Sequence, residues 1–180
     1  MSVLALKTVS ADMMAHGGFL WPEKGTVVCE DWNPEPECGG GLHSFLWGQG
    51  GSLLSTNESA KWLVLEIEDY VDLHAEQNFK IKSPKAYVVF CGKKDEAIQY
   101  LLDHGAQDKP VYGCRKMSGN WSTLTGGDRS TLTGGNGSTL EVKYWDGKRI
   151  RREVAYIGEK KIKANTPYKY DTKKKLWLKA

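Results

Sequence analysis

The sequence predicts a mainly β protein with an α+β N-terminal head, a short β-solenoid of octapeptide repeats and a β-rich C-terminal cap. Three observations lead to this fold class. An octapeptide, G-x-x-S-T-L-T-G, is repeated almost three times between Gly119 and Leu140. The segment before the repeats combines alternating apolar runs with one helical pattern, and the segment after them alternates again. We expect the domains to be residues 1–110, 111–141 and 142–180.

The head is expected to contain strands, helices and a long irregular segment. Apolar residues recur with helical spacing over residues 94–104, and Gly105 follows where a helix would stop. A shorter helix is expected at residues 10–15, with Ser10 as its N-cap. A Pro-Glu-Lys-Gly turn predicts a hairpin over residues 19–29. Strands are expected at residues 3–9, 62–68, 79–81 and 86–91.

Residues 30–51 form the irregular segment, which is rich in glycine, proline and aromatic residues, and loops of this length usually carry function. Three successive glycines allow backbone amides to approach an anion, and a histidine and a tryptophan add a titrating group and a stacking face. The alternative is a mainly structural loop that folds its tryptophans onto the sheet. The expected ligand-binding residues are Asp31, Trp32, Gly39, Gly40, Gly41, His43 and Trp47.

Repetition at a short fixed period is typical of a solenoid, where each unit buries its apolar side by stacking on the next. In the order Ser-Thr-Leu-Thr, side chains alternate between two faces, so serine and leucine point inward and threonine outward. Glycine pairs between the units suit corners at which backbones approach closely. We expect the outward threonines to form an assembly surface in a homo-oligomer. These residues are Thr123, Thr125, Thr131, Thr133 and Thr139.

The expected cap is strongly basic. Residues 142–180 contain 13 basic and 4 acidic residues, whereas residues 1–141 contain 12 basic and 18 acidic ones. Strands are expected at residues 142–145, 150–157 and 176–178, with a turn at Asp146 and Gly147. The basic side chains could bind nucleic acid or another polyanion, or could protect the open end of the solenoid from edge pairing. The candidate polyanion-binding residues are Arg149, Arg151, Arg152, Lys173, Lys174 and Lys175.

Four cysteines, Cys29, Cys38, Cys91 and Cys114, are too few and too scattered for a disulfide framework. The spacing of Cys29, Cys38 and His43 fits no compact zinc motif, so we expect free thiols, with zinc as the alternative. The repeats lack the aspartate that calcium-binding nonapeptides require. We therefore expect no metal and no cofactor.

Composition is that of a soluble protein: 40% of the residues are hydrophobic and 26% are charged, and no apolar run reaches the length of a membrane span. The N-terminus lacks the basic start and apolar core of a secretory signal. These features predict a cytoplasmic protein without a membrane partner.

The octapeptide resembles that of bacterial ice nucleation proteins, whose threonine ladders order water. Those proteins carry dozens of copies, whereas this chain has three and Glu141 replaces the ladder threonine in the last. The resemblance therefore implies the coil geometry, and we expect no ice nucleation. The segments DWNPEPECGGGLHSFLWG, STLTGG and VAYIGEKKIKANTPYKYD also resemble an uncharacterised family of bacterial and prophage proteins, with variable repeat numbers between a fixed head and tail. That resemblance implies a bacterial or phage source.

The expected function is that of a non-enzymatic, phage- or prophage-encoded binding protein that oligomerises through its solenoid. The head would bind a small nucleotide-like ligand or a host protein, for example to block host defence in the bacterial cytoplasm. The first alternative is an enzyme that acts on a nucleotide or NAD-like substrate through residues 39–43, with His43 as the catalytic group. The second alternative is a basic nucleic-acid-binding protein, whose affinity would fall steeply with salt.

Overall fold

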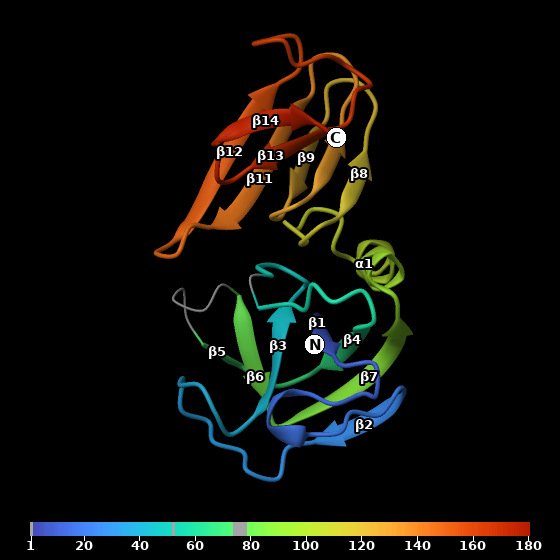
Figure 1. Ribbon diagram of the computed structural model, residues 1–180, viewed down its shortest axis with the longest axis vertical. Helices are drawn as coiled ribbons and strands as arrows, with labels where there is room; N and C mark the ends of the chain where they lie inside the picture. The colour runs from blue at the N-terminus through green and yellow to red at the C-terminus, as the bar shows by residue number, and fades with distance from the viewer. Residues whose placement is uncertain (1, 52, 74–78) are drawn as a thin grey trace. The chain divides into compact units, whose positions relative to one another are not determined.

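The computed structural model describes residues 2–51, 53–73 and 79–180, and these residues are mainly β, with 42% strand and one α-helix. Their sheets are open, and the described residues form no closed barrel. The chain divides into two compact units, Met1–Gly105 and Ala106–Ala180 (Figure 1). The finer division of the second unit at residue 141 remains a prediction.

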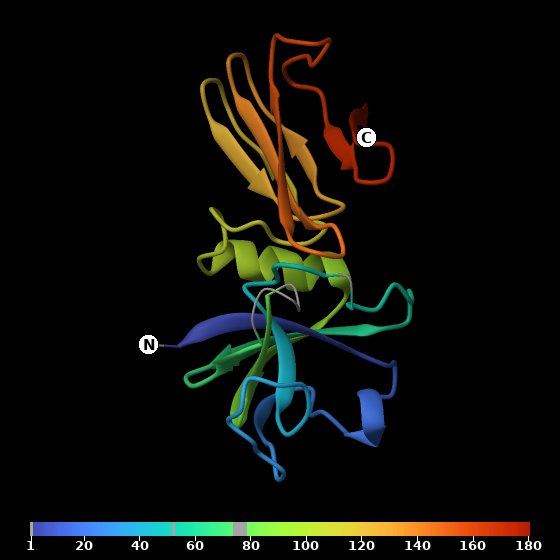
Figure 2. The ribbon, with the colours of Figure 1, turned by 90° about the vertical axis from the view of Figure 1, so that its left-hand side faces the viewer.

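The first unit is built on a seven-stranded sheet with the order β2-β7-β4-β1-β3-β6-β5. Every pairing in it is antiparallel, and β1 lies in the middle (Figure 2). The strands are β1 (Val3–Val9), β2 (Gly25–Val28), β3 (Leu42–Leu46), β4 (Lys61–Ile67), β5 (Val71–Asp72), β6 (Lys80–Ser83) and β7 (Lys85–Gly92).

The helix α1 (Lys94–Asp103) packs against β4 and β7 (Figure 1). Its buried residues are Ala97, Ile98, Leu101 and Leu102. The backbone N–H of Lys93 donates to Glu96 Oε2 at 2.9 Å, which caps the first turn. The predicted helix over residues 94–104 is therefore confirmed to within one residue.

The predicted helix at residues 10–15 is wrong. Ser10 Oγ accepts a hydrogen bond from the Met14 N–H at 2.9 Å, and Met13 has a positive φ of 67°. These contacts close a turn, because a serine side chain competes with helical bonds for the backbone. A short 3₁₀ helix, η1 (His16–Gly18), follows, and Met14 then bridges Leu20.

The predicted hairpin over residues 19–29 is also wrong, because β2 pairs with β7 instead of folding back on the preceding residues. The expected irregular segment over residues 30–51 contains β3, which lies between β1 and β6. Its sequence, LHSFL, was too short and too mixed to predict a strand, and its two neighbours in the sheet decide its conformation.

The second unit contains two sheets, with the orders β14-β13-β10-β8 and β12-β11-β9. Between them lies a core cluster that includes Leu124, Leu132, Leu140 and Tyr168. The hairpin of β11 and β12 turns at Asp146, whose N–H donates to Arg149 O at 3.1 Å, so the predicted turn is confirmed. The strands are β8 (Arg115–Met117), β9 (Thr123–Gly126), β10 (Thr131–Thr133), β11 (Thr139–Trp145), β12 (Ile150–Tyr156), β13 (Tyr168–Asp171) and β14 (Leu176–Lys179).

Candidate functional site

A groove opens in the first unit where two neighbouring strands part. β1 and β3 pair at only two positions, Ala5 with Leu46 and Leu6 with Phe45. Beyond these pairs lies a cavity of about 860 Å³ whose walls include Lys7 from β1. The far wall consists of residues Leu42, His43, Ser44 and Phe45 of β3.

Basic side chains from three strands lie in or near this groove: Lys7, His43 and Lys80 line it, whereas Lys82 does not. Lys80 Nζ donates to Cys38 Sγ at 3.1 Å, and the buried Lys82 donates through Nζ to Gly39 O at 3.1 Å. The Lys82 ammonium also lies 5.8 Å from the centre of the Trp32 ring, a cation–π contact. His43 Nε2 accepts a hydrogen bond from the Gly39 N–H at 3.4 Å, so the neutral ring carries its proton on Nδ1.

Crowding of these cations disfavours further positive charge. Burial, followed by repulsion from Lys80, Lys7 and Lys82, lowers the pKa of His43 from 6.5 to about 4. Burial and Lys80 lower the pKa of Lys7 from 10.5 to about 8. At neutral pH the His43 ring is therefore neutral, and Lys7 keeps its ammonium form over a narrower pH range than an ordinary lysine.

The structure brings some of the predicted ligand-binding residues together and leaves others outside. Asp31, Gly39, Gly41 and His43 line the groove. Trp32, Gly40 and Trp47 do not belong to its lining. A Cβ on Gly41 would lie 2.9 Å from Lys82 Cβ, so this glycine allows close packing against β6. Sequence reasoning missed Lys7, Lys80 and Lys82, because only the sheet brings β1 and β6 beside the glycine-rich loop.

The cysteines and His43 do not form a metal site of three or more ligands within the described ranges, where no such cluster of histidine, cysteine and acidic residues occurs. Cys29 Sγ donates to Asp31 Oδ1 at 2.8 Å, and burial raises the pKa of this thiol. Cys38 Sγ lies 3.9 Å from His43 Nε2. All four cysteines are free thiols.

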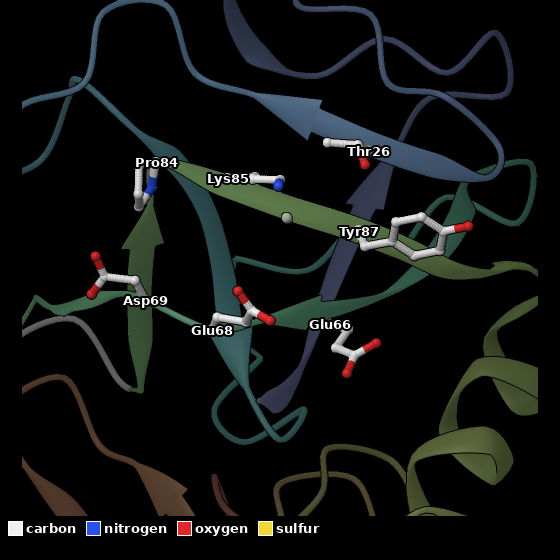
Figure 3. A pocket seen from close by; sticks show the side chains of 8 residues that line it. Thr26, Glu66, Glu68, Asp69, Pro84, Lys85 and Tyr87 are labelled. Atoms are coloured by element: carbon white, nitrogen blue, oxygen red, sulfur yellow. The ribbon is translucent and has the colours of Figure 1, made fainter. Parts of the chain in front are cut away.

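A second cavity, of about 420 Å³, lies along β2, β4 and β7 (Figure 3). Glu66, Glu68 and Asp69 line one part of it, and Lys85 and Tyr87 extend from β7. The carboxylates are not grouped closely enough to count among metal-binding clusters of the described chain. This acidic cavity was not predicted, because only the pairing of β7 with β2 and β4 brings its lining residues together.

In the second unit, the repeats stack in parallel with an offset of 16 residues. Thr123 pairs with Thr139 across β9 and β11, and Thr131 pairs with Arg115 across β10 and β8. The Ser122 N–H donates to Ser138 Oγ at 3.1 Å, across the same separation of 16 residues. Successive octads therefore alternate between the two sheets, and each octad stacks on the second one before it.

Serine and glycine hold the corners of this stack. Ser130 Oγ donates to Val111 O and Ser138 Oγ to Gly119 O, each at 3.0 Å and across 19 residues. A Cβ on Gly135 would lie 2.4 Å from Asn120 Oδ1 and 2.6 Å from Gly119 C. The corners therefore need glycine where one layer of chain rests on the layer before it.

The five predicted assembly threonines face away from the leucine core. Thr123 is exposed, and the other four are partly exposed. Leu124, Leu132 and Leu140 are 0–5% exposed. Glu141 takes the place of a threonine opposite Thr125, where it is buried beneath the ion-paired side chains of Arg152 and Lys143. A role of these threonines in a homo-oligomer stays a prediction.

Sequence reasoning missed a fourth, altered octad. Residues Cys114, Arg115, Lys116 and Met117 occupy the four places of Ser-Thr-Leu-Thr, eight residues before Ser122. Cys114 Sγ lies 3.2 Å from Ser130 Oγ, 16 residues later. Lys116 is buried and donates through Nζ to Gln107 O, Lys109 O and Thr125 O at 2.6–2.8 Å. None of these four residues matches the Ser-Thr-Leu-Thr consensus, so only the spacing of eight residues from Ser122 could have revealed this octad in the sequence.

The predicted polyanion-binding residues are not equally available. Arg151 is ion-paired with Asp146, and Arg152 Nε lies 2.5 Å from Glu141 Oε2. The bonds that Asp146 accepts from the Arg149 and Lys148 backbone and from Arg151 lower the pKa of its carboxyl. Arg149, Lys173, Lys174 and Lys175 are exposed. Two of the six residues therefore stabilise the unit's own hairpin and sheet.

Comparison with known proteins finds similarity to ice nucleation proteins. The relatives come from Xanthomonas campestris pv. translucens (37% identity over 112 residues, 62% of this chain), Pantoea ananas (InaU, 38% over 105 residues, 58%) and Pseudomonas fluorescens (40% over 103 residues, 57%). The chain spans only 7–10% of the length of these relatives. The resemblance of the octapeptide is thus confirmed. No family model matches the chain, and no solved structure matches it.

This similarity corrects three expectations. The relatives are ice nucleation proteins, so the predicted phage-encoded ligand binder with an anti-defence role is wrong. The relatives also contradict the phage origin and the cytoplasmic location, the latter having been expected from composition and from the N-terminal residues. The enzymatic and nucleic-acid alternatives gain no support from relatives named for ice nucleation. Within the described residues, no helix has the length and apolarity needed to cross a membrane.

Proposed function

We propose that the protein interacts with ice, and that Ala106–Ala180 is a short two-sided β-solenoid with 16 residues per turn. The observation that carries this proposal is the parallel register of Thr123 with Thr139, 16 residues apart, on a unit whose octapeptide is similar to that of ice nucleation proteins. The similarity alone would not decide the geometry, because it covers a small part of each relative.

The physical basis is a regular array of threonine side chains. Neighbouring strands lie about 4.8 Å apart, and alternate residues along a strand lie about 6.7 Å apart. Each β-branched threonine is held in few rotamers, so its hydroxyl and methyl groups keep fixed positions. Such an array can hold a layer of water in an ordered arrangement.

The array on this chain is small. The outward face of β9 and β11 has threonine at three of four paired positions, Thr123, Thr125 and Thr139, and Glu141 at the fourth. The outward face of β8 and β10 has threonine at Thr131 and Thr133, and Arg115 and Met117 at the positions paired with them. We therefore expect the chain to adsorb to existing ice and to leave the freezing temperature of water droplets almost unchanged.

Ice partitioning tests this proposal. When ice grows slowly from a dilute solution, the wild-type chain should be enriched in the ice, and the double variant Thr123→Lys/Thr139→Lys should lose most of that enrichment. The control, Thr26→Lys/Thr56→Lys, places the same charges on exposed threonines of the first unit and should behave as the wild type. Equal partitioning of all three proteins would refute the proposal.

A gain-of-function variant tests the same surface from the opposite direction. Glu141→Thr completes a square of four threonines with Thr123, Thr125 and Thr139. It leaves Arg152 and Lys143 without their partner, but the loss is small because both lie at the surface. Enrichment in ice should rise above that of the wild type, and a decrease in a fully folded variant would contradict the proposed array.

A further inference from the structure

The groove of the first unit, formed by β1, β3 and β6 with the glycine-rich loop, contains more positive charge than its neighbours neutralise. Lys7, Lys80 and Lys82 form no ion pair with a carboxylate among the described residues. Glu30 and Asp31 line the rim, where both are exposed. Lys7 and Lys80 line the cavity and repel one another, whereas Lys82 lies outside its lining, so an anion bound beside Lys7 and Lys80 would relieve that repulsion.

A buried polar atom in the same wall points to a ligand independently of the charges. Ser44 is 1% exposed and lines the groove, and its Oγ has no hydrogen-bond partner among the described residues. A buried hydroxyl without a partner costs about 1–3 kcal/mol, so native structures rarely leave one unpaired. A ligand oxygen in the groove would accept its hydrogen bond.

The size and lining of the groove indicate what kind of anion it suits. Its volume of about 860 Å³ is many times that of a single phosphate or carboxylate and lies within the range of organic ligand sites. Apolar side chains make up much of the remaining lining: Phe19, Trp21, Phe45, Leu53 and Leu54. The cavity therefore offers an apolar chamber beside a cluster of cations.

We propose that this groove binds a small organic anion that has an apolar body and a carboxylate or phosphate head. The head lies among Lys7, Lys80 and the Ser44 hydroxyl, and the body lies against the aromatic and leucine side chains. Lys82 donates its hydrogen bond to Gly39 O, so it attracts the anion only through its charge. This site belongs to the first unit, and it does not depend on the proposed action of the second unit on ice.

Binding of simple probes to the full chain tests the proposal. Octanoate and octyl phosphate carry the two possible head groups on one apolar body, octanol lacks the charge, and inorganic phosphate lacks the body. We expect octanoate or octyl phosphate to bind saturably by calorimetry, at least tenfold more tightly than octanol or inorganic phosphate. Whichever of octanoate and octyl phosphate binds more tightly identifies the head group that the groove prefers. Equal binding of octanol, or saturation by neither anion, would overturn the proposal.

Two variants and one titration locate the bound anion. Lys80→Gln removes a lysine of the groove and should weaken binding at least tenfold, whereas Lys85→Gln removes an exposed lysine outside it and should change affinity less than twofold. The groups that face His43 are Lys80, Lys7, Lys82 and Asp31, and added negative charge among them should raise the His43 pKa above about 4 in an NMR titration. Equal weakening by both variants, or an unchanged His43 pKa at saturation, would show that the anion binds elsewhere.

Discussion

Lys116 lies beside Leu132 across the parallel strands β8 and β10, in the inward position that leucine occupies in the other octads. Its Nζ donates to three backbone carbonyls, one of them on Thr125 of strand β9 in the other sheet. Because β8 is the edge strand of its sheet, this lysine stands at the end of the column of inward residues, and its ammonium satisfies three backbone carbonyl groups there.

Removing this lysine should destabilise the second unit. Lys116→Met keeps the length of the side chain but leaves three carbonyls without their donor, which should cost about 2 kcal/mol in the free energy of unfolding. Hydrogen exchange of the amides in Ala106–Ala180, followed by mass spectrometry, measures this loss. Lys169→Met, at an exposed position of β13, is the control and should be near neutral. Unchanged exchange in Lys116→Met would contradict the role of Lys116 at the end of the column.

The corner glycines should differ in their tolerance of alanine. Gly135 rests on Gly119 and Asn120, and an added Cβ would lie 2.4–2.6 Å from their atoms. Gly119 occupies the equivalent corner but has nothing within 4 Å of an added Cβ. We expect Gly135→Ala to lower the free energy of unfolding by about 2 kcal/mol and Gly119→Ala to change it little, as measured by urea denaturation. Similar losses in both variants would show that backbone freedom, and not stacking, accounts for these glycines.

Insertion of whole coils should preserve the fold. A duplicate of residues 119–134 adds the 16 residues that separate stacked partners, so each inward leucine keeps its column. A duplicate of residues 119–130 adds 12 residues and shifts the downstream strands out of register. In thermal denaturation, the variant with 16 added residues should have a Tm within a few degrees of the wild type. The variant with 12 added residues should be unfolded or strongly destabilised. Equal stability of the two insertions would contradict the 16-residue register.

Acid should weaken the first unit through His43. Its folded pKa of about 4 lies below the ordinary value of 6.5, so between these values the unfolded chain binds the proton more tightly. The free energy of unfolding should therefore fall as the pH drops from 6.5 to 4, by on the order of 1 kcal/mol after allowance for solvent screening.

Denaturation of wild type and His43→Gln across this pH range checks the prediction. Other acidic groups titrate in the same window, so the informative quantity is the difference between the two proteins, which should shrink at low pH. His16→Gln, at an exposed position, serves as the control and should follow the wild type. A constant difference between wild type and His43→Gln would contradict the assigned pKa.

The sequence by itself determined the features that depend on local periodicity. The alternation in residues 3–9 predicted β1, the apolar spacing in residues 94–104 predicted α1, and the octapeptide predicted inward leucines and outward threonines. These predictions succeeded because residues only two to four positions apart determine which face of a helix or strand is apolar.

Only the tertiary structure decided how distant segments combine. It placed β3 inside a loop-like sequence, paired β2 with β7 in place of a local hairpin, and brought Lys7 of β1 beside His43. It also revealed Lys116 as the altered leucine of a fourth octad, through its register with Leu132. The physical reason is that strand pairing and repulsion between charges involve residues far apart in the chain. The periodicity of a short segment therefore cannot predict them.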